Sequence, residues 1–89
     1  MRKLEYLSTF RRDLKKIVKS GRYRLADINE VVESLQRDQP LAKRQRDHAL
    51  TGNWKDHREC HIKPDWLLIY RLEPDVLVLV RTGSHAELF

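Results

Sequence analysis

The chain has 89 residues, of which 18 are Lys or Arg and 13 are Asp or Glu, so its formal net charge is +5 with neutral histidines. This length predicts one domain, residues 1–89, and excludes a large substrate cavity closed by a second domain. One cysteine excludes an internal disulfide framework and a multi-cysteine zinc site. A basic surface attracts phosphate polymers first and acidic proteins second.

The first half of the chain predicts one strand followed by two helices. Polar and apolar residues alternate over residues 3–7, as in a short strand. Apolar residues at helical spacing predict a first helix between a side-chain cap at Ser8 or Thr9 and a stop at Gly21. The same spacing predicts a second helix over Leu25–Arg37. The outer face of the first helix is rich in Lys and Arg, so the pair forms a basic amphipathic hairpin.

The second half predicts three strands and a final helical turn. The strands cover residues 58–63, 66–70 and 76–80, and the last two are apolar enough to be covered on both faces. Ser84 and Glu87 have the spacing of a capping box, which predicts a short helix at the end. The order β-α-α-β-β-β is typical of an α+β domain in which two N-terminal helices pack on a small antiparallel sheet.

Histidines are concentrated in the second half, and three of them can face outward. His48 lies in a polar connection over residues 41–57, His61 lies on the polar side of a strand, and His85 follows the last strand. A sheet of this order can bring the ends of these segments to one surface. Asp65 begins a strand close to His61, so a carboxylate is available to orient an imidazole.

These residue types fit cleavage of RNA by its own 2′-hydroxyl group. That reaction needs a base, an acid and donors that stabilise the phosphorane. Imidazole titrates near neutral pH and can serve in either role, while an arginine binds phosphate through several N–H groups. The three histidines, Asp65 and Arg81 therefore predict RNA cleavage without a metal or other cofactor. Each also has a commoner interpretation, as a surface histidine, a turn residue or a salt-bridge partner.

A zinc site is the competing use of histidine and cysteine. Cys60 and His61 are adjacent in a predicted strand, so their side chains point to opposite faces and do not bind one ion together. We expect Cys60 to pack inward beside Ile62.

Three runs of residues in the second half follow one another with the spacing of known motifs. They are DHALTGNWK at 47–55, RECHIKPDWLLIY at 58–70 and RTGSHAELF at 81–89. Together they resemble the YafQ family of mRNA interferase toxins, a branch of the RelE/ParE superfamily of bacterial type II toxin–antitoxin systems. The first half agrees with that family in the order and length of its elements.

The resemblance implies a RelE-like microbial RNase fold and a ribosome-dependent endoribonuclease that cuts mRNA in the A site and inhibits translation. It implies that His48, His61, Asp65 and His85 form the acid–base group. His85 donates a proton to the leaving 5′-oxygen, and His48 or His61 acts on the 2′-hydroxyl. Arg81 is implied as the ligand of the transition-state phosphate.

The resemblance also implies substrate-binding roles for Phe89, Trp66 and Lys55. Phe89 stacks on a base in this interpretation, whereas a simpler one makes it an apolar plug for the final turn. The chain has His57 where the family often has tyrosine, and we interpret His57 as a surface substitution.

The partners that the resemblance implies are a ribosome with its mRNA and an acidic antitoxin of the DinJ or RelB type, with a ribbon-helix-helix DNA-binding end. The antitoxin is expected along the basic helical face or across the site, and promoter DNA is contacted only through it. The chain is expected to be a monomer alone and a heterotetramer with the antitoxin. With no apolar run long enough for a bilayer and no signal-peptide core, we expect a cytoplasmic protein without membrane contact.

Two other functions remain open from the sequence. The ParE-like branch of the superfamily shares the fold and inhibits DNA gyrase, although it lacks this set of histidines. The basic helices alone are also consistent with a non-catalytic module that binds the ribosome or RNA.

Overall fold

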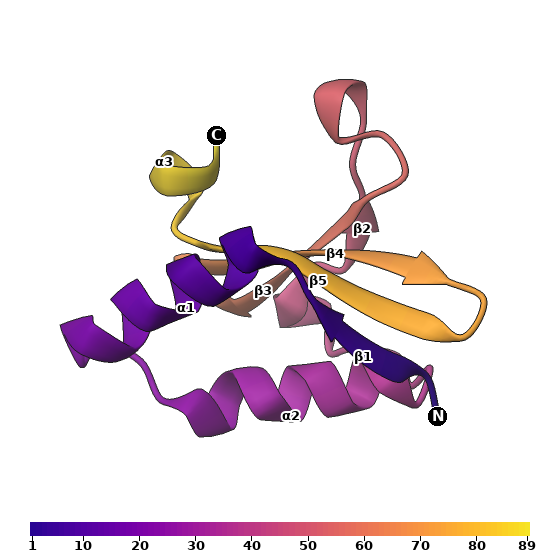
Figure 1. The fold of residues 1–89 in the computed structure, drawn as a ribbon, viewed down its shortest axis with the longest axis horizontal. Coiled ribbons are helices and arrows are strands. Elements are labelled where there is room, and N and C mark those ends of the chain that lie inside the picture. The colour runs from indigo at the N-terminus through magenta and orange to yellow at the C-terminus, as the bar shows by residue number, and fades with distance from the viewer.

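A five-stranded sheet is the frame of the protein in the computed structural model, which describes residues 1–89 (Figure 1). The strand order is β1-β5-β4-β3-β2, with β1 parallel to β5 and all other neighbours antiparallel. The strands are β1 (Lys3–Tyr6), β2 (His48–Ala49), β3 (Arg58–Lys63), β4 (Trp66–Glu73) and β5 (Val76–Gly83). The α+β fold is confirmed, but the sheet is mixed rather than wholly antiparallel because β1 lies at the edge next to β5 and runs in the same direction.

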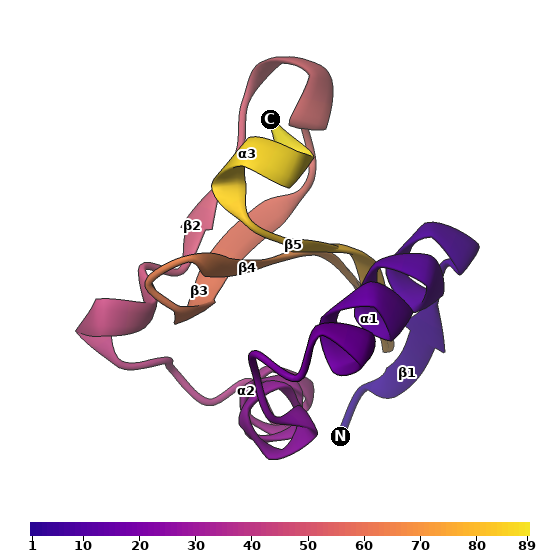
Figure 2. The ribbon, with the colours of Figure 1, turned by 90° about the vertical axis from the view of Figure 1, so that its left-hand side faces the viewer.

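Two helices cover one face of the sheet, and a short third helix lies on the other face (Figure 2). They are α1 (Ser8–Ser20), α2 (Leu25–Gln36) and α3 (His85–Leu88). Gly21 ends α1 with φ of 67°, a left-handed conformation that glycine adopts without steric cost. None of these helices has both the length and the apolar character that crossing a membrane requires.

The larger core lies between the sheet and the two long helices. Cys60 belongs to it, is fully buried, and packs in the same cluster as Ile62, which confirms the expected inward orientation. Burial raises the pKa of the Cys60 thiol to about 12, so it is an unreactive packing residue. The cluster comprises Phe10, Ile28, Val31, Val32, Leu35, Cys60, Ile62, Trp66, Leu68, Tyr70, Leu77 and Leu79.

A smaller core lies on the opposite face, under α3. It comprises Leu67, Ile69, Val78, Val80 and Leu88. Because β4 and β5 are covered on both faces, both are apolar at nearly every central position, as the sequence predicted. This second core fixes α3, and therefore the last residues of the chain, over the sheet.

The predicted helical turn after β5 is confirmed by its cap. The Ser84 backbone N–H donates to a carboxylate oxygen of Glu87 at 2.8 Å, and the Glu87 N–H donates to Ser84 Oγ at 3.2 Å. Hydrogen bonds from Ser84 to the carboxylate, first of all from its backbone N–H, hold the pKa of Glu87 below its usual range. The cap therefore sets the direction in which His85, the first residue of α3, leaves the sheet.

Candidate active site

Two of the predicted histidines meet on the sheet face opposite α1 and α2, around a carboxylate. His48 is paired with Glu59 across β2 and β3, and His61 follows Glu59 by two residues, so all three side chains share a face. One Glu59 oxygen, Oε1, lies 3.7 Å from Nε2 of His48 and 3.6 Å from Nε2 of His61. The Glu59 side chain is 7% exposed, against 50% for His48. The structure thus places one buried carboxylate between two imidazoles.

Glu59 was not among the residues predicted from the sequence, and the predicted orienting residue lies elsewhere. Asp65 is in the turn between β3 and β4, where its Oδ2 is 3.7 Å from Nη2 of Arg22. That turn directs the side chain toward the connection between α1 and α2, so Asp65 is paired with an arginine and not with His61. The alternation of residues 58–63 places Glu59 on the same side of the strand as His61, and this was the sequence signal that could have identified Glu59 as a candidate.

The His48 ring is held in one orientation by the backbone. Its Nδ1 lies 2.6 Å from the carbonyl oxygen of Arg46, which itself has a left-handed φ of 46°. A carbonyl oxygen only accepts hydrogen bonds, so Nδ1 carries the hydrogen in this contact. In the neutral ring Nε2 is then the unprotonated nitrogen, and it is the one that faces Glu59.

The loop that carries His48 is anchored to the sheet by Asp47. Its carboxylate accepts a hydrogen bond from the Tyr70 hydroxyl and one from Nε of Arg58 at 3.4 Å. Burial and the bond to Asp47 raise the pKa of Tyr70, so the hydroxyl remains a donor throughout the physiological range. These contacts fix the position of His48 relative to β3 and β4.

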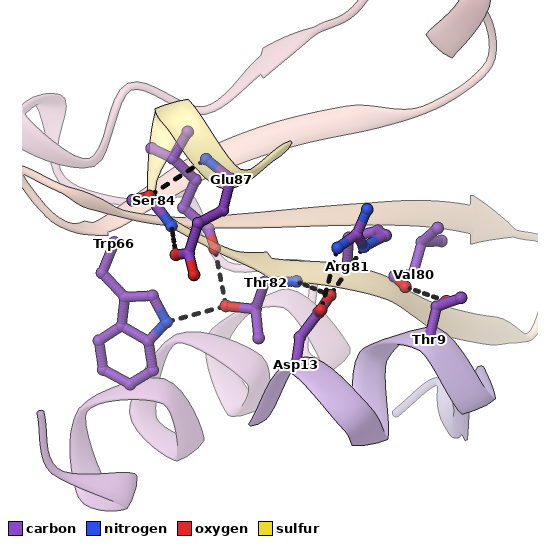
Figure 3. Close-up of polar contacts among 9 residues, drawn as sticks. Thr9, Asp13, Trp66, Val80, Arg81, Thr82, Ser84 and Glu87 are labelled. Carbon is purple, nitrogen blue, oxygen red and sulfur yellow. Dashed lines mark hydrogen bonds and ion pairs between the residues drawn. The ribbon is translucent and has the colours of Figure 1, made fainter. Parts of the chain in front are cut away.

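Arg81 is aligned by the first helix (Figure 3). Its Nε and Nη2 donate to the two carboxylate oxygens of Asp13 at 2.8 and 3.0 Å, and these bonds raise the pKa of Arg81. Asp13 also accepts the Thr82 backbone N–H at 3.2 Å. In Figure 3 one terminal nitrogen of Arg81 points away from Asp13, and Nη1 makes no hydrogen bond within the chain. That nitrogen remains available to an anion.

The preceding turn of α1 bonds β5 just beyond the residues that pair with β1. Thr9 Oγ1 donates to the carbonyl oxygen of Val80 at 2.8 Å, one helical turn before Asp13. The predicted side-chain cap at Ser8 or Thr9 is therefore wrong: Leu7 is the N-cap residue and no side chain caps the helix. The Thr9 hydroxyl bonds the neighbouring strand instead of its own helix.

His85 lies in a separate group of rings around α3. Its ring is 5.2 Å from that of Phe89, which is 51% exposed and lies 6.3 Å from the Trp54 ring, measured between centroids. His57 packs edge-to-face on Trp54 at 5.4 Å and its Nδ1 bonds the Lys55 carbonyl oxygen, so it is a half-buried part of this group. No hydrogen bond or ion pair joins His85 to His48 or His61.

Trp66 is placed in the core, contrary to its predicted role in substrate binding. Its ring is 1% exposed and stacks on Tyr23 with 4.7 Å between centroids. The indole N–H donates to Thr82 Oγ1 at 2.8 Å, and Thr82 Oγ1 donates in turn to the Leu67 carbonyl oxygen. A ring in this position has no face free for a nucleobase. Lys55, by contrast, is exposed and directly follows Trp54 in the chain.

The chain offers no preformed metal centre. No group of three or more His, Cys, Asp or Glu side chains is arranged to hold a metal ion.

Solved toxins share this fold over its whole length. A metal-bound toxin from Helicobacter pylori is 47% identical to this chain, with a TM-score of 0.93 and coverage of 100% of both chains. YafQ in the Escherichia coli DinJ–YafQ toxin–antitoxin complex is 35% identical, with a TM-score of 0.85, covering 99% of this chain and 97% of that one. The shared fold and sequence thus place this chain in the class of toxins from bacterial toxin–antitoxin systems.

The family follows from the sequence matches. Residues 2–89 match the family model described as bacterial toxin of type II toxin-antitoxin system, YafQ. The mRNA interferase toxin YafQ of E. coli strain K12 is 37% identical over 92 residues, which span 99% of this chain and 96% of that protein. The chain belongs to the YafQ family, as the three sequence motifs indicated.

Proposed function

We propose that the protein is an mRNA interferase, a ribosome-dependent endoribonuclease that cuts mRNA in the A site and thereby inhibits translation. The observation that carries this proposal is the pair of imidazoles facing buried Glu59 on the sheet face opposite α1 and α2, with His48 half exposed. The name of the E. coli relative supports an activity on mRNA. Without a ribosome to present the mRNA, the small exposed site has few contacts with which to position a substrate.

His48 is the base in this proposal. Its Nδ1 is committed to the Arg46 carbonyl oxygen, so Nε2 of the neutral ring carries the lone pair that accepts the 2′-hydroxyl proton. His61 is less suited because its side chain is only 19% exposed. It packs beside Glu59 and shapes the site.

His85 is the acid, and Arg81 stabilises the developing charge. His85 is exposed at the start of a capped turn, so its ring is presented to solvent without loss of core packing. A protonated imidazole there donates to the leaving 5′-oxygen. Arg81 offers Nη1 to a nonbridging phosphate oxygen while Asp13 holds the rest of the guanidinium. Phe89 stacks on a base, and exposed Lys55 binds a phosphate.

The partner in this proposal is an acidic antitoxin with a ribbon-helix-helix end, and the complex is a heterotetramer in which only the antitoxin contacts promoter DNA. The E. coli relative is solved in complex with the antitoxin DinJ. A groove along α1 exposes the apolar side chains of Tyr6 and Val18 beside half-buried Leu14. Its basic lining residues are Arg11, Lys15 and Lys19. An amphipathic helix with an acidic margin is complementary to that pattern.

Toe-printing on a translated mRNA tests the activity. We expect the purified chain to produce discrete cuts inside A-site codons, and none on the same mRNA without ribosomes. A messenger that stays intact, together with trapped gyrase–DNA cleavage complexes, would instead support a gyrase inhibitor. Ribosome binding without any cut would support a non-catalytic module.

The chemistry of the cut ends tests the mechanism. Because the nucleophile is the 2′-hydroxyl of the RNA, the upstream product should end in a 2′,3′-cyclic phosphate or the 3′-phosphate derived from it. Cleavage should persist with a chelator selective for zinc and copper over magnesium, which the ribosome itself requires. A 3′-hydroxyl end, or loss of cleavage that added zinc or copper restores, would contradict acid–base catalysis by the histidines alone.

A further inference from the structure

Glu59 occupies a position that packing alone does not explain. Its side chain is 7% exposed, yet it makes no hydrogen bond with any other group of the chain. Its ionic contacts are with Nε2 of His48 and Nε2 of His61, both from the same oxygen, Oε1. A buried carboxylate with two partners at ion-pair distance and no strong hydrogen bond opposes folding unless those partners carry hydrogens toward it.

The two imidazoles do not face this carboxylate in the same way. His61 has no other hydrogen bond, so its neutral ring can direct an Nε2–H at Glu59. His48 cannot do so while neutral, because its one hydrogen is on Nδ1 and bonds the Arg46 carbonyl oxygen. The His48–Glu59 contact therefore becomes favourable only after Nε2 of His48 has taken up a proton.

We propose that Glu59 is a positioning residue that aligns His61 and stabilises the imidazolium formed on His48 during cleavage. This inference rests on the proposed function. The 2′-hydroxyl transfers its proton to Nε2 of His48 as the 2′-oxygen bonds to phosphorus, and the bond from phosphorus to the 5′-oxygen breaks as His85 protonates that oxygen. Glu59 keeps its charge throughout, as the buried aspartate of a serine protease triad does beside its histidine.

Glu59 is the only carboxylate that is placed to stabilise a charged His48. On its face of the sheet the neighbouring β4 residue is Ile69, which is apolar and fully buried. Asp47, the carboxylate directly before His48 in the chain, is bound to Tyr70 and Arg58. Glu59 is thus the one negative group within ion-pair distance of His48.

The test compares Glu59→Gln, Glu59→Asp and the matched control Glu30→Gln, which makes the same chemical change on the exposed face of α2. Single-turnover cleavage is measured at increasing concentrations of ribosomes programmed with mRNA. For Glu59→Gln we expect the maximal rate to fall roughly 10- to 100-fold, with the half-saturating concentration unchanged within about two-fold. Glu59→Asp should recover part of the rate because it restores the charge, and Glu30→Gln should match the parent.

Thermal unfolding of the same proteins separates this role from a structural one. Because Glu59→Gln removes a poorly satisfied buried charge, its unfolding temperature should equal or exceed that of the parent while its activity falls. A Glu59→Gln protein that cleaves within three-fold of the parent would overturn the inference. The inference would also be overturned if Glu59→Gln were slow and unfolded at a clearly lower temperature than the parent, and Glu59→Asp cleaved no faster than Glu59→Gln. A parent that leaves translated mRNA intact in this assay would contradict the proposed function itself.

Discussion

Replacing His85 with glutamine should abolish nearly all cleavage of translated mRNA while leaving the fold intact. The ring is exposed at the start of a capped turn and fills no core volume, so the free energy of unfolding should change by about 0.5 kcal/mol or less. A positioned general acid contributes roughly 10²–10⁴-fold in rate, and glutamine cannot transfer a proton at neutral pH. Primer extension on programmed ribosomes measures the rate, and circular dichroism measures the stability.

The control for that experiment is His57→Gln, the same change at the histidine that packs on Trp54. It should cleave within a few-fold of the parent, because its ring faces a tryptophan and a carbonyl oxygen and is not presented to solvent as His85 is. If His85→Gln cleaves as fast as His57→Gln, His85 is not the acid, and one of the two histidines at Glu59 must take that role.

Trp66→Ala should leave the folded chain only marginally stable. Truncating a buried aromatic ring costs about 3–5 kcal/mol, and the whole domain is stabilised by about 4–13 kcal/mol on the usual scaling with length. Trp66→Phe keeps most of the ring volume and loses only the indole N–H bond to Thr82, at a cost of about 1–3 kcal/mol. Urea unfolding of both variants gives these differences directly.

Cleavage by Trp66→Phe decides whether the ring has any contact with RNA. Since it lies in the core, the folded variant should cleave within about three-fold of the parent. Trp54→Phe is the matched control for stability, because that ring is only half buried and should lose little. A Trp66→Phe protein of nearly full stability that cleaves a hundred-fold more slowly would restore the substrate-binding role.

Local patterns predicted the helices, the three long strands and the final turn, because each pattern lies within one element. What they missed depends on contacts between distant residues. The parallel pairing of β1 with β5 joins residues 3–6 to residues 76–79, and no periodicity within either strand gives its direction. β2 has only two residues, too few for any alternation. The long strands also run beyond their apolar parts, since Arg71 of β4 pairs with Val78 and Arg81 of β5 pairs with Ile69.

The sequence singled out His48 and His61, which the structure brings together, but not the carboxylates that contact the candidate site residues. Glu59 alternates with apolar residues and so has the pattern of a solvent-facing side chain, although tertiary packing leaves it almost fully buried. Asp13 lies on a basic helix 68 residues before Arg81, and nothing in the sequence connects the two. Asp65 and Trp66 were predicted at the site, but their side chains lie elsewhere in the fold. The motif gives their positions in the chain and not the layer of the fold that their side chains enter.

The link between α1 and β5 determines when the Arg81 side chain becomes aligned as the chain is made. Asp13 both closes the edge of β5 and holds Arg81, so the guanidinium is aligned only after the first helix has docked on the last strand. A chain leaving the ribosome that makes it completes β5 and α3 last, so this contact forms only once the whole domain has been synthesised. The alignment of this guanidinium therefore depends on two segments 68 residues apart and is present only in the complete domain.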